Sequence, residues 1–505
     1  MRYIAIILFM DASKTLRLGY TAADNQLVGL SLDERRQGTY IIGTTGTGKS
    51  TLLKNIIYQD MHQDREHGLM VLDPHGDLID EVLGLVPKDR LKDVILFDPM
   101  DMDHPFGLNL LECDRSDPHQ VRWVVSTVMG TLERLFSNSW GPRLEHVLRH
   151  TLLTAMLLPN STFIELLLLL TNENFRKDVL AELRDPILNQ FWNDLPLSKK
   201  DRYELISSTL NKLSPFITDH SMRNIIGQPK NTFNMREIMD EGKILLVNLS
   251  KGDLGEANSS LLGAVQVNMV LIAALQRRSI PVKQRRPFHL IVDEFQNFAT
   301  ESFDILQSEA RKYAVDVVVA HQYRDQLSDS SKGSTLNVGN LIAFRTTGLD
   351  SYSIASQFDN TPPPPDTRVE PIYQQYPYQG INALIEARLS TDEGKLYQEV
   401  EIPRRAYKDV EAEMANRLSI LPNFEAWCRL IQVPEKPGGR PKLVEHHLVT
   451  ENLTEGKSDP TIATRIRENS RKLAKPRKMV EEDIMRRSFG EIKNEENVAL
   501  AEKMR

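Results

Sequence analysis

The sequence predicts an α/β protein with a mostly parallel sheet, helices on both faces of that sheet and an inserted all-helical region. A glycine-rich octapeptide, Gly43–Ser50, follows a short apolar run and precedes a helical stretch. Six further apolar runs end in acidic or polar residues, as strands covered on both faces of a parallel sheet do. A long segment without strand signals, residues 115–239, separates two of these runs.

The six runs are Leu69–Asp73, Val94–Asp98, Lys243–Leu249, His289–Glu294, Asp316–Gln322 and Leu341–Arg345. Helical stretches separate many of them, which is the alternation expected of an α/β fold. Between the second and third runs, Leu144, Val147, Leu148, Leu152 and Leu153 recur at helical spacing. We therefore expect a helical insertion whose apolar faces form its own core.

The octapeptide reads Gly-Thr-Thr-Gly-Thr-Gly-Lys-Ser and fits the phosphate-binding pattern G-x-x-x-x-G-K-[ST] at every fixed position. Glycines let such a loop fold around a polyphosphate, and the dipole of the following helix favours the negative charge. Lys49 is expected to reach the β- and γ-phosphates, and Ser50 to bind Mg²⁺. The expected nucleotide-binding residues are Gly43, Thr44, Thr45, Gly46, Thr47, Gly48, Lys49, Ser50 and Thr51.

Two carboxylates, Asp293 and Glu294, end the fourth apolar run in the manner of a Walker B motif. Asp293 is expected to hold Mg²⁺ through its water shell, and Glu294 to act as general base on the attacking water. One apolar run with two carboxylates is a weak signal, but its pairing with a complete phosphate loop makes it strong. The two motifs together predict Mg²⁺-dependent ATP hydrolysis, with Lys49 and Glu294 as catalytic residues.

Two further catalytic candidates follow the Walker B run. Gln322 ends the next strand candidate, where related ATPases place a γ-phosphate sensor, and His321 beside it is interpreted as a structural neighbour. Arg311 lies eleven residues before Gln322, and an arginine there could project onto ATP bound by a neighbouring subunit. Arg345 is the alternative candidate for this arginine finger. An ordinary surface salt bridge is the alternative for both arginines.

Together these segments resemble the TraG/TraD-like type IV secretion coupling proteins, which belong to the HerA–FtsK superfamily of DNA-pumping ATPases. The segments are Gly43–Ser50, Asp73–Asp77, Leu246–Gly252, Val292–Gln296 and the stretch from Glu309 to Gln322. The resemblance covers roughly residues 15–360. It implies a RecA-like P-loop motor, usually hexameric, with an all-α domain inserted before the Walker B strand and DNA passing through the ring.

The resemblance also implies partners: DNA bound without sequence preference, the relaxosome and membrane-bound secretion components. Coupling proteins of this kind usually carry N-terminal membrane helices, and the sequence shows none. No stretch reaches the roughly 18 apolar residues needed to cross a membrane, and the short apolar stretch Tyr3–Met10 predicts a strand. We therefore expect no intrinsic membrane span, and a cytoplasmic location that includes docking at the inner face of the membrane.

Composition adds two constraints. The 505-residue chain has a formal net charge of −7, so any DNA contact is expected at a local patch. Its two cysteines, Cys113 and Cys428, lie far apart and lack metal-ligand spacing, which favours a reducing compartment and excludes a disulfide scaffold.

We expect four parts of the chain: 1–114 and 240–432 as the two parts of the motor domain, 115–239 as the all-α insertion, and 433–505 as a linker and charged tail. The prolines of Thr361–Asp366 predict a stiff loop, and those of Val433–Lys442 a linker. Basic residues then cluster between Arg465 and Lys478. A solvated helix face or disordered tail is the plainer interpretation of this cluster, and a contact with DNA or a partner is the alternative.

The leading functional hypothesis is an ATP-driven DNA translocase used in conjugative transfer. One alternative is a soluble HerA-like motor that works with a nuclease in DNA processing or defence. The other is an adaptor that recruits protein substrates through the helical domain and the tail, with little DNA pumping. The sequence leaves open the strandedness of the DNA, the polarity and step size of translocation, and the number of subunits.

Overall fold

The computed structural model describes residues 15–62, 67–196, 198–327, 329–362, 367–371, 397–401, 406–434 and 439–489. The expected strand Tyr3–Met10 lies outside these residues, as does most of the expected loop Thr361–Asp366. The chain forms two compact units. The larger unit contains Met1–Phe344 and Asn423–Arg505, and the smaller contains Arg345–Pro422.

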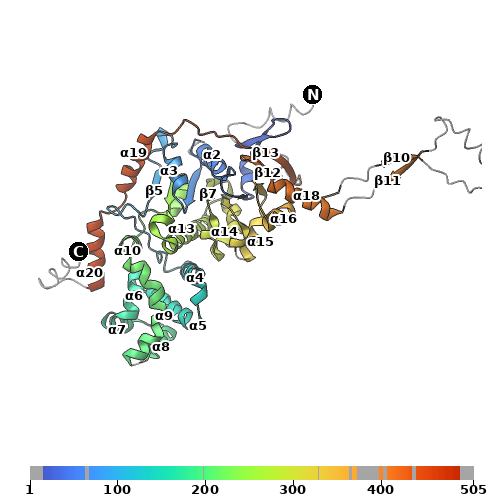
Figure 1. Ribbon diagram of the computed structural model, residues 1–505. Coiled ribbons are helices and arrows are strands. Elements are labelled where there is room, and N and C mark those ends of the chain that lie inside the picture. The colour runs from blue at the N-terminus through green and yellow to red at the C-terminus, as the bar shows by residue number, and fades with distance from the viewer. Residues whose placement is uncertain are drawn as a thin grey trace, which may run out of the picture. The chain divides into compact units, whose positions relative to one another are not determined.

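An eleven-stranded sheet forms the centre of the larger unit (Figure 1). In spatial order its strands are β2 (Leu27–Leu30), β1 (Leu16–Thr21), β13 (Lys442–Val449), β12 (Glu425–Gln432), β9 (Asn340–Ala343), β3 (Thr39–Ile42), β8 (Val315–His321), β7 (Phe288–Val292), β4 (Gly68–Asp73), β6 (Ile244–Asn248) and β5 (Val94–Phe97). The strands from β9 to β5 all run parallel. They contain all six runs expected as strands, so the predicted fold class is confirmed.

The other side of the sheet is antiparallel and differs from the expected linker and tail. β12 pairs antiparallel with β9, and β13 pairs antiparallel with both β12 and β1. Lys442–Val449, expected within the linker and tail, therefore completes the central sheet. The physical reason is incomplete burial: in β13 only Leu448 is buried, and in β12 every second side chain is buried, so neither strand carries a continuous apolar run.

Helices cover both faces of the sheet. On one face, α2 (Lys49–His62) and α3 (Asp77–Leu83) share an apolar core with alternate strand residues such as Leu69 and Val71. On the other face lie α13 (Glu256–Gln276) and α14 (Glu301–Glu309), as Figure 1 shows. The shorter helices of this unit are α1 (Leu32–Arg35), α11 (Met235–Glu241), α12 (Lys251–Leu254) and α15 (Asp329–Leu336).

One helix in the described part of the chain is long and apolar enough to cross a membrane. It is α13 extended to Ser279, Glu256–Ser279. The expectation that no stretch is long and apolar enough is therefore wrong for this helix. Of its most apolar window, 83% is buried inside the protein. The residues of α13 are apolar because they pack between α4, α11 and α14.

The segment between β5 and β6 is helical, as expected. Its helices are α4 (Pro118–Leu135), α5 (Pro142–Leu157), α6 (Phe163–Thr171), α7 (Glu173–Glu182), α8 (Pro186–Asn193), α9 (Lys199–Thr218) and α10 (His220–Ile226). Capping side chains define their starts: Thr162 and Glu165 form a capping box at α6, and Asp185 accepts from two amides of α8. α4 packs against α13 and so attaches this region to the sheet.

Two C-terminal helices also pack on the larger unit. α19 (Pro460–Arg471) lies along edge strand β5, where the Leu96 amide donates to Ser470 Oγ at 2.9 Å. α20 (Arg477–Phe489) contacts α6 and α10 of the helical region, and Arg487 lies 2.8 Å from Glu165. Of the two plainer interpretations of residues 465–478, a solvated helix face or a disordered tail, the structure has helices, and α19 satisfies a backbone donor of edge strand β5.

The smaller unit was not predicted as separate. Its helices α16 (Leu349–Ala355) and α18 (Tyr407–Ser419) pack together, and β10 (Thr367–Pro371) pairs antiparallel with β11 (Tyr397–Glu401). The Thr346 amide donates to the Leu418 carbonyl at 3.2 Å, which ties the start of this unit to the end of α18.

Candidate nucleotide site

The phosphate-loop candidate lies at the carboxyl end of β3, in the middle of the parallel strands. Gly43–Gly48 connects β3 to α2, which begins at Lys49. Gly46 and Gly48 have φ angles of +76° and +116°, which other residues adopt only with strain. These conformations turn the loop over the start of α2. Gly46 is exposed, with no other atoms within 4 Å of where a Cβ would lie, so the loop is open to a ligand.

Lys49 lies folded under this loop. Its Nζ donates to the Gly43 carbonyl at 2.6 Å, and only 6% of the residue is exposed. Burial lowers the pKa of Lys49, although the nearby carboxylates Glu294 and Asp293 oppose that shift. Next along the helix, Ser50 is exposed, so its hydroxyl is free to meet a metal ion at the helix N-terminus.

The acidic end of β7 lies two strands from the loop. The Asp293 amide donates to the Leu72 carbonyl of β4, and burial, with the charges of Glu294 and Asp73, raises the pKa of Asp293 to about 7. Glu294 has a φ of +44°, in the left-handed region, and its amide donates to Asp293 Oδ1 at 2.9 Å. A bulky residue held in this conformation is strained, and such strain is common at functional sites.

A chain of side-chain hydrogen bonds joins the loop to this acidic pair. Thr45 Oγ1 donates to Gln322 Oε1 at 2.8 Å, and Gln322 Nε2 donates to Glu294 Oε1 at 2.6 Å. The other carboxylate oxygen of Glu294 accepts from Gln296 Nε2 at 2.7 Å. Both oxygens of Glu294 are thereby oriented by amide donors. Gln322 directly follows β8, the strand between β3 and β7, and this position explains why it reaches both sides.

A buried carboxylate of β4 adds negative charge. Asp73 is fully buried and accepts from the amides of His75 and Ile79 at 2.8 and 3.1 Å. Burial raises the pKa of Asp73, and its charge contributes to the raised pKa of Asp293. Carboxylate and hydroxyl oxygens near a phosphate loop suit Mg²⁺, which prefers oxygen ligands and shares them with phosphates. Ser50 and Asp293 therefore fit the proposed metal role.

Sequence reasoning missed several residues that support Glu294. Asn297 Nδ2 donates to the Glu294 carbonyl at 2.7 Å, and Lys251 donates to Asn297 Oδ1. Arg134, from α4 of the helical region, donates to the carbonyls of Asn297 and Ala299. Gln296 and Asn297 directly follow the Walker B carboxylates, so proximity could have suggested them. For Arg134 the sequence carries no signal, because 163 residues separate it from Asn297.

Of the two arginine candidates, Arg311 does not reach the phosphate loop of its own chain. Arg311 lies in a short turn before β8 and donates to Gln37 Oε1 at 2.6 Å. Gln37 precedes β3, so Arg311 lies at the amino ends of β3 and β8, opposite the phosphate loop. Arg345 belongs to the smaller unit, where its Nη1 donates to the Leu421 carbonyl at 3.1 Å.

His321 is a core residue, as the sequence indicated. It is fully buried, stacks on Tyr40 with ring centroids 5.3 Å apart, and meets the ring of Phe295 edge-on. Burial, together with the charges of Arg324 and Lys49, lowers the pKa of His321 to about 3. It is therefore neutral at physiological pH and supports the strand that carries Gln322.

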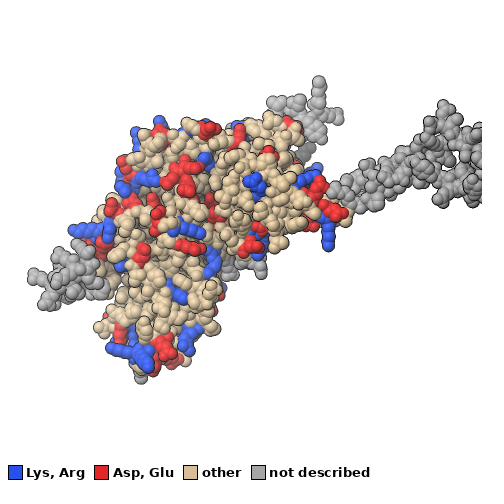
Figure 2. Space-filling model, viewed as in Figure 1, with Lys and Arg blue, Asp and Glu red and all other residues tan. Residues whose placement is uncertain are grey.

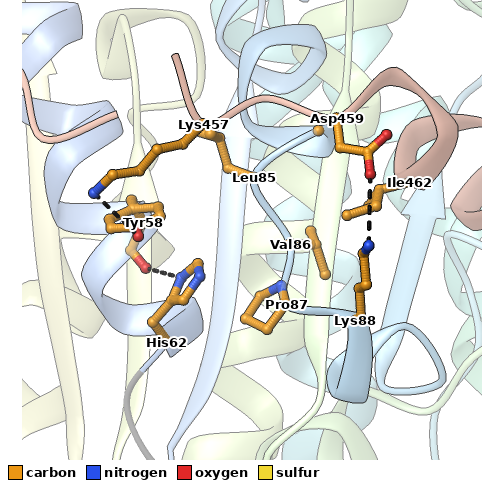
Figure 3. Close-up of a pocket in the computed structure, with 10 residues that line it drawn as sticks. Tyr58, His62, Leu85, Val86, Pro87, Lys88, Lys457, Asp459 and Ile462 are labelled. Carbon is orange, nitrogen blue, oxygen red and sulfur yellow. Dashed lines mark hydrogen bonds and ion pairs between the residues drawn. The ribbon is translucent and has the colours of Figure 1, made fainter. Parts of the chain in front are cut away.

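A pocket of about 400 Å³ lies elsewhere, between the end of α2, the turn after α3 and residues 457–462 (Figure 3). Lys457 lies over the ring of Tyr58, with Nζ 4.7 Å from the centroid, and Lys88 Nζ lies 3.9 Å from Asp459. None of the predicted site residues lines this pocket. The candidate site is therefore the phosphate loop and the acidic end of β7.

The fold and this loop define a P-loop nucleotide-binding protein with a RecA-like core. Within that class, the chain belongs to the family described as the type IV secretion-system coupling protein DNA-binding domain, whose model matches residues 25–335. This confirms the resemblance drawn from the sequence. No curated protein sequence matches the chain significantly.

Solved structures share the fold. The bacterial conjugative coupling protein TrwBdeltaN70, in its unbound monoclinic form, is 16% identical with a TM-score of 0.54, covering 86% of this chain and 89% of that one. Plasmid coupling protein TrwB in complex with ADP and Mg²⁺ is 17% identical with a TM-score of 0.52, covering 86% and 90%. VirB4 of Thermoanaerobacter pseudethanolicus is 12% identical with a TM-score of 0.50, covering 88% and 98%.

Proposed function

We propose that this chain is an ATP-driven motor that moves DNA as a type IV coupling protein in conjugative transfer. The observation that carries the proposal is the hydrogen-bonded chain Thr45–Gln322–Glu294, which joins the phosphate loop to the acidic end of β7. Through such a link, the presence or loss of the γ-phosphate changes the position of the catalytic carboxylate. The TrwB structure with ADP and Mg²⁺ supports ATP and Mg²⁺ as the ligands.

The proposed roles follow from the geometry. The amides of the loop bind the phosphates, and Lys49 exchanges its bond with the Gly43 carbonyl for phosphate oxygens. Ser50 and Asp293 hold Mg²⁺, which supplies positive charge against the charge that develops on the transferring group. Glu294 takes the proton of the attacking water. Gln322 orients the Glu294 carboxylate and contacts the loop through Thr45.

We propose a ring of six copies, as the resemblance to hexameric motors implies. Arg311 supports an assembly of this kind, because it lies at the amino ends of β3 and β8, and its own phosphate loop lies at the carboxyl end of β3. A finger role therefore requires a neighbouring copy, whose bound ATP Arg311 would contact.

DNA is the proposed cargo, and the name of the family's matching domain supports it. Acidic and basic side chains are interspersed over the face shown in Figure 2, so binding depends on local basic groups in the ring and not on net charge. The relaxosome and membrane-bound secretion components are the proposed partners, at the cytoplasmic face of the membrane.

Family membership favours conjugative coupling over DNA processing with a nuclease. A relaxase gene beside the gene for this chain would support coupling, and a nuclease gene would support processing. DNA-stimulated ATP hydrolysis distinguishes a DNA motor from the adaptor alternative, because an adaptor with little DNA pumping needs no such stimulation.

The test is ATP hydrolysis by the purified chain with Mg²⁺, with and without DNA, at low salt. We expect ATP turnover that DNA of any sequence increases, and we expect Lys49→Ala to lose this turnover. Hydrolysis that no DNA stimulates would favour the adaptor. Turnover that persists in Lys49→Ala would mean that the phosphate loop is not the site.

A further inference from the structure

Phe424 is a strained and exposed aromatic residue beside the phosphate loop. Its φ of +67° lies in the left-handed region, where a bulky side chain is uncommon and glycine or asparagine is the usual choice. The residue is 46% exposed, so burial does not explain why an aromatic ring occupies this position. Residues held in strained backbone cluster at active sites and ligand clamps.

The backbone of Phe424 is fixed to the loop on one side and to the end of β13 on the other. Its amide donates to the carbonyl of Thr47 in the phosphate loop at 2.8 Å. Its carbonyl accepts from the amide of Thr450 at 2.8 Å and from Thr450 Oγ1 at 2.9 Å. These bonds hold the strained backbone conformation of Phe424 in place beside the loop.

The ring lies directly against the last glycine of the loop. A Cβ at Gly48 would lie 3.1 Å from both Cα and Cδ1 of Phe424. A second ring, that of Phe344, also lies 3.1 Å from this point, but Phe344 is fully buried and cannot meet a ligand. Phe424 is thus the exposed ring at this end of the loop.

The order of the strands places Phe424 on the side of the loop away from the catalytic groups. Glu294 and Gln322 follow β7 and β8, which lie on one side of β3, whereas β9 and β12 lie on the other. Phe424 directly precedes β12. Because β12 runs antiparallel to β9, the first residues of β12 lie level with the carboxyl ends of the parallel strands, beside the loop.

We propose that Phe424 is the platform on which the base of the bound nucleoside triphosphate stacks. The inference rests on the proposed function, since the γ-phosphate must face Glu294, and the nucleoside then extends toward the opposite side of the loop. Every base has a π-face, so stacking on this ring contributes affinity with little discrimination between bases. The platform predicts that ATP and GTP depend on Phe424 to a similar degree.

The test compares ATP with inorganic tripolyphosphate, which carries the phosphates without a base. Binding of each to the full chain with Mg²⁺ is measured by calorimetry for the wild type, Phe424→Leu and Phe424→Trp. Loss of base–aromatic stacking should weaken ATP binding by about 5- to 30-fold in Phe424→Leu. This loss lies toward the lower end of the range found when base-stacking aromatic residues are replaced. Tripolyphosphate binding should not change. Tyr203→Leu, at an exposed aromatic residue of α9, is the matched control and should change neither.

Phe424→Trp should keep ATP affinity, and its indole fluorescence should change on adding ATP but not tripolyphosphate. An equal loss of both ligands in Phe424→Leu would overturn the inference, because it would mean that Phe424 only supports the loop through Thr47. Unchanged ATP affinity in Phe424→Leu would overturn it as well. If the wild type bound neither ligand, the nucleotide site itself would fail, and this inference with it.

Discussion

Gln322 donates its side-chain amide to Glu294, with Nε2 2.6 Å from Oε1, and it accepts from Thr45 of the phosphate loop at 2.8 Å. One amide thus contacts both the general-base candidate and the loop expected to hold the phosphates. This arrangement gives a physical reason for a glutamine directly after β8, since a glutamine can donate and accept at once.

Replacing Gln322 by glutamate tests that arrangement. Gln322→Glu keeps the length of the side chain but cannot donate to Glu294, and it adds a repelling charge. We expect kcat for ATP to fall by about 10²-fold, the order observed when an active site loses one hydrogen-bond donor that acts in the transition state. The KM should change little, because the loop still binds the phosphates. Gln190→Glu, an exposed position in α8, is the control, and a Gln322→Glu enzyme with wild-type kcat would refute the positioning role.

Arg311 is expected to act across a subunit boundary. Arg311→Ala and Lys49→Ala should each be inactive alone, and mixing them should restore part of the hydrolysis, since some interfaces then combine an intact loop with an intact arginine. An arginine finger is worth about 10³–10⁵ in rate in other phosphoryl-transfer enzymes. The readout is turnover against mixing ratio. No recovery, in mixtures shown to contain both variants in one oligomer, would favour Arg345 or a site complete within one chain.

Acid should destabilise the protein through His321. Its pKa is lowered from an ordinary 6.5 to about 3 in the folded chain, first by burial. The unfolded chain therefore binds a proton that the folded chain excludes. The contribution of His321 to the free energy of unfolding is complete above pH 6.5 and is lost progressively as the pH falls toward 3. The loss is about 1.4 kcal/mol per pH unit inside that window.

His321→Gln should lower this slope relative to the wild type. Burial also lowers the pKa of His67, to about 4, which contributes with the same sign, whereas the pKa of Asp293, raised to about 7, contributes with the opposite sign. Denaturant unfolding between pH 7 and pH 5 measures the slope. If His321→Gln and the wild type lost stability in parallel, His321 would not be the group that titrates.

The basic cluster near the C-terminus offers a test of DNA binding. Truncation after Val433 is unsuitable, because it removes β13 and the bonds from Thr450 to Phe424. Arg467 and Arg471 already pair with Asp80 and Asp101. The exposed residues to neutralise together are Arg465, Lys475 and Lys478, which form no salt bridge with described residues.

If this cluster binds DNA, neutralising it should lower the slope of log affinity against log salt by about 0.9 for each DNA phosphate that the variant no longer neutralises. Basal hydrolysis should stay unchanged, since none of these residues belongs to the nucleotide site. Lys92→Gln, an exposed lysine outside the cluster, is the control. An unchanged salt slope would identify the cluster as a solvated or partner-binding surface.

The parallel half of the sheet could be predicted because strands buried on both faces read as uninterrupted apolar runs. The antiparallel half could not be predicted, because strands such as Glu425–Gln432 bury only alternate residues. The prolines and glycines of Val433–Lys442 also predict a linker at that point. The motifs located the loop and the carboxylates. The hydrogen bonds that support them, such as those from Arg134 to Asn297, join residues distant in sequence and have no local signal. The role of Phe424 depends on its φ angle and on β12 lying beside β9, which only the fold provides.

The catalytic role of Glu294 is tested by measuring ATP binding and ATP turnover for Glu294→Gln beside the wild type. The variant removes the general base but keeps the loop, Lys49, Ser50 and Asp293. We expect it to bind ATP with Mg²⁺ as the wild type does, while kcat falls by about 10²- to 10⁴-fold, the contribution of a positioned base. Wild-type turnover in Glu294→Gln would contradict the assignment of Glu294 as the base and, with it, the catalytic role given to Gln322.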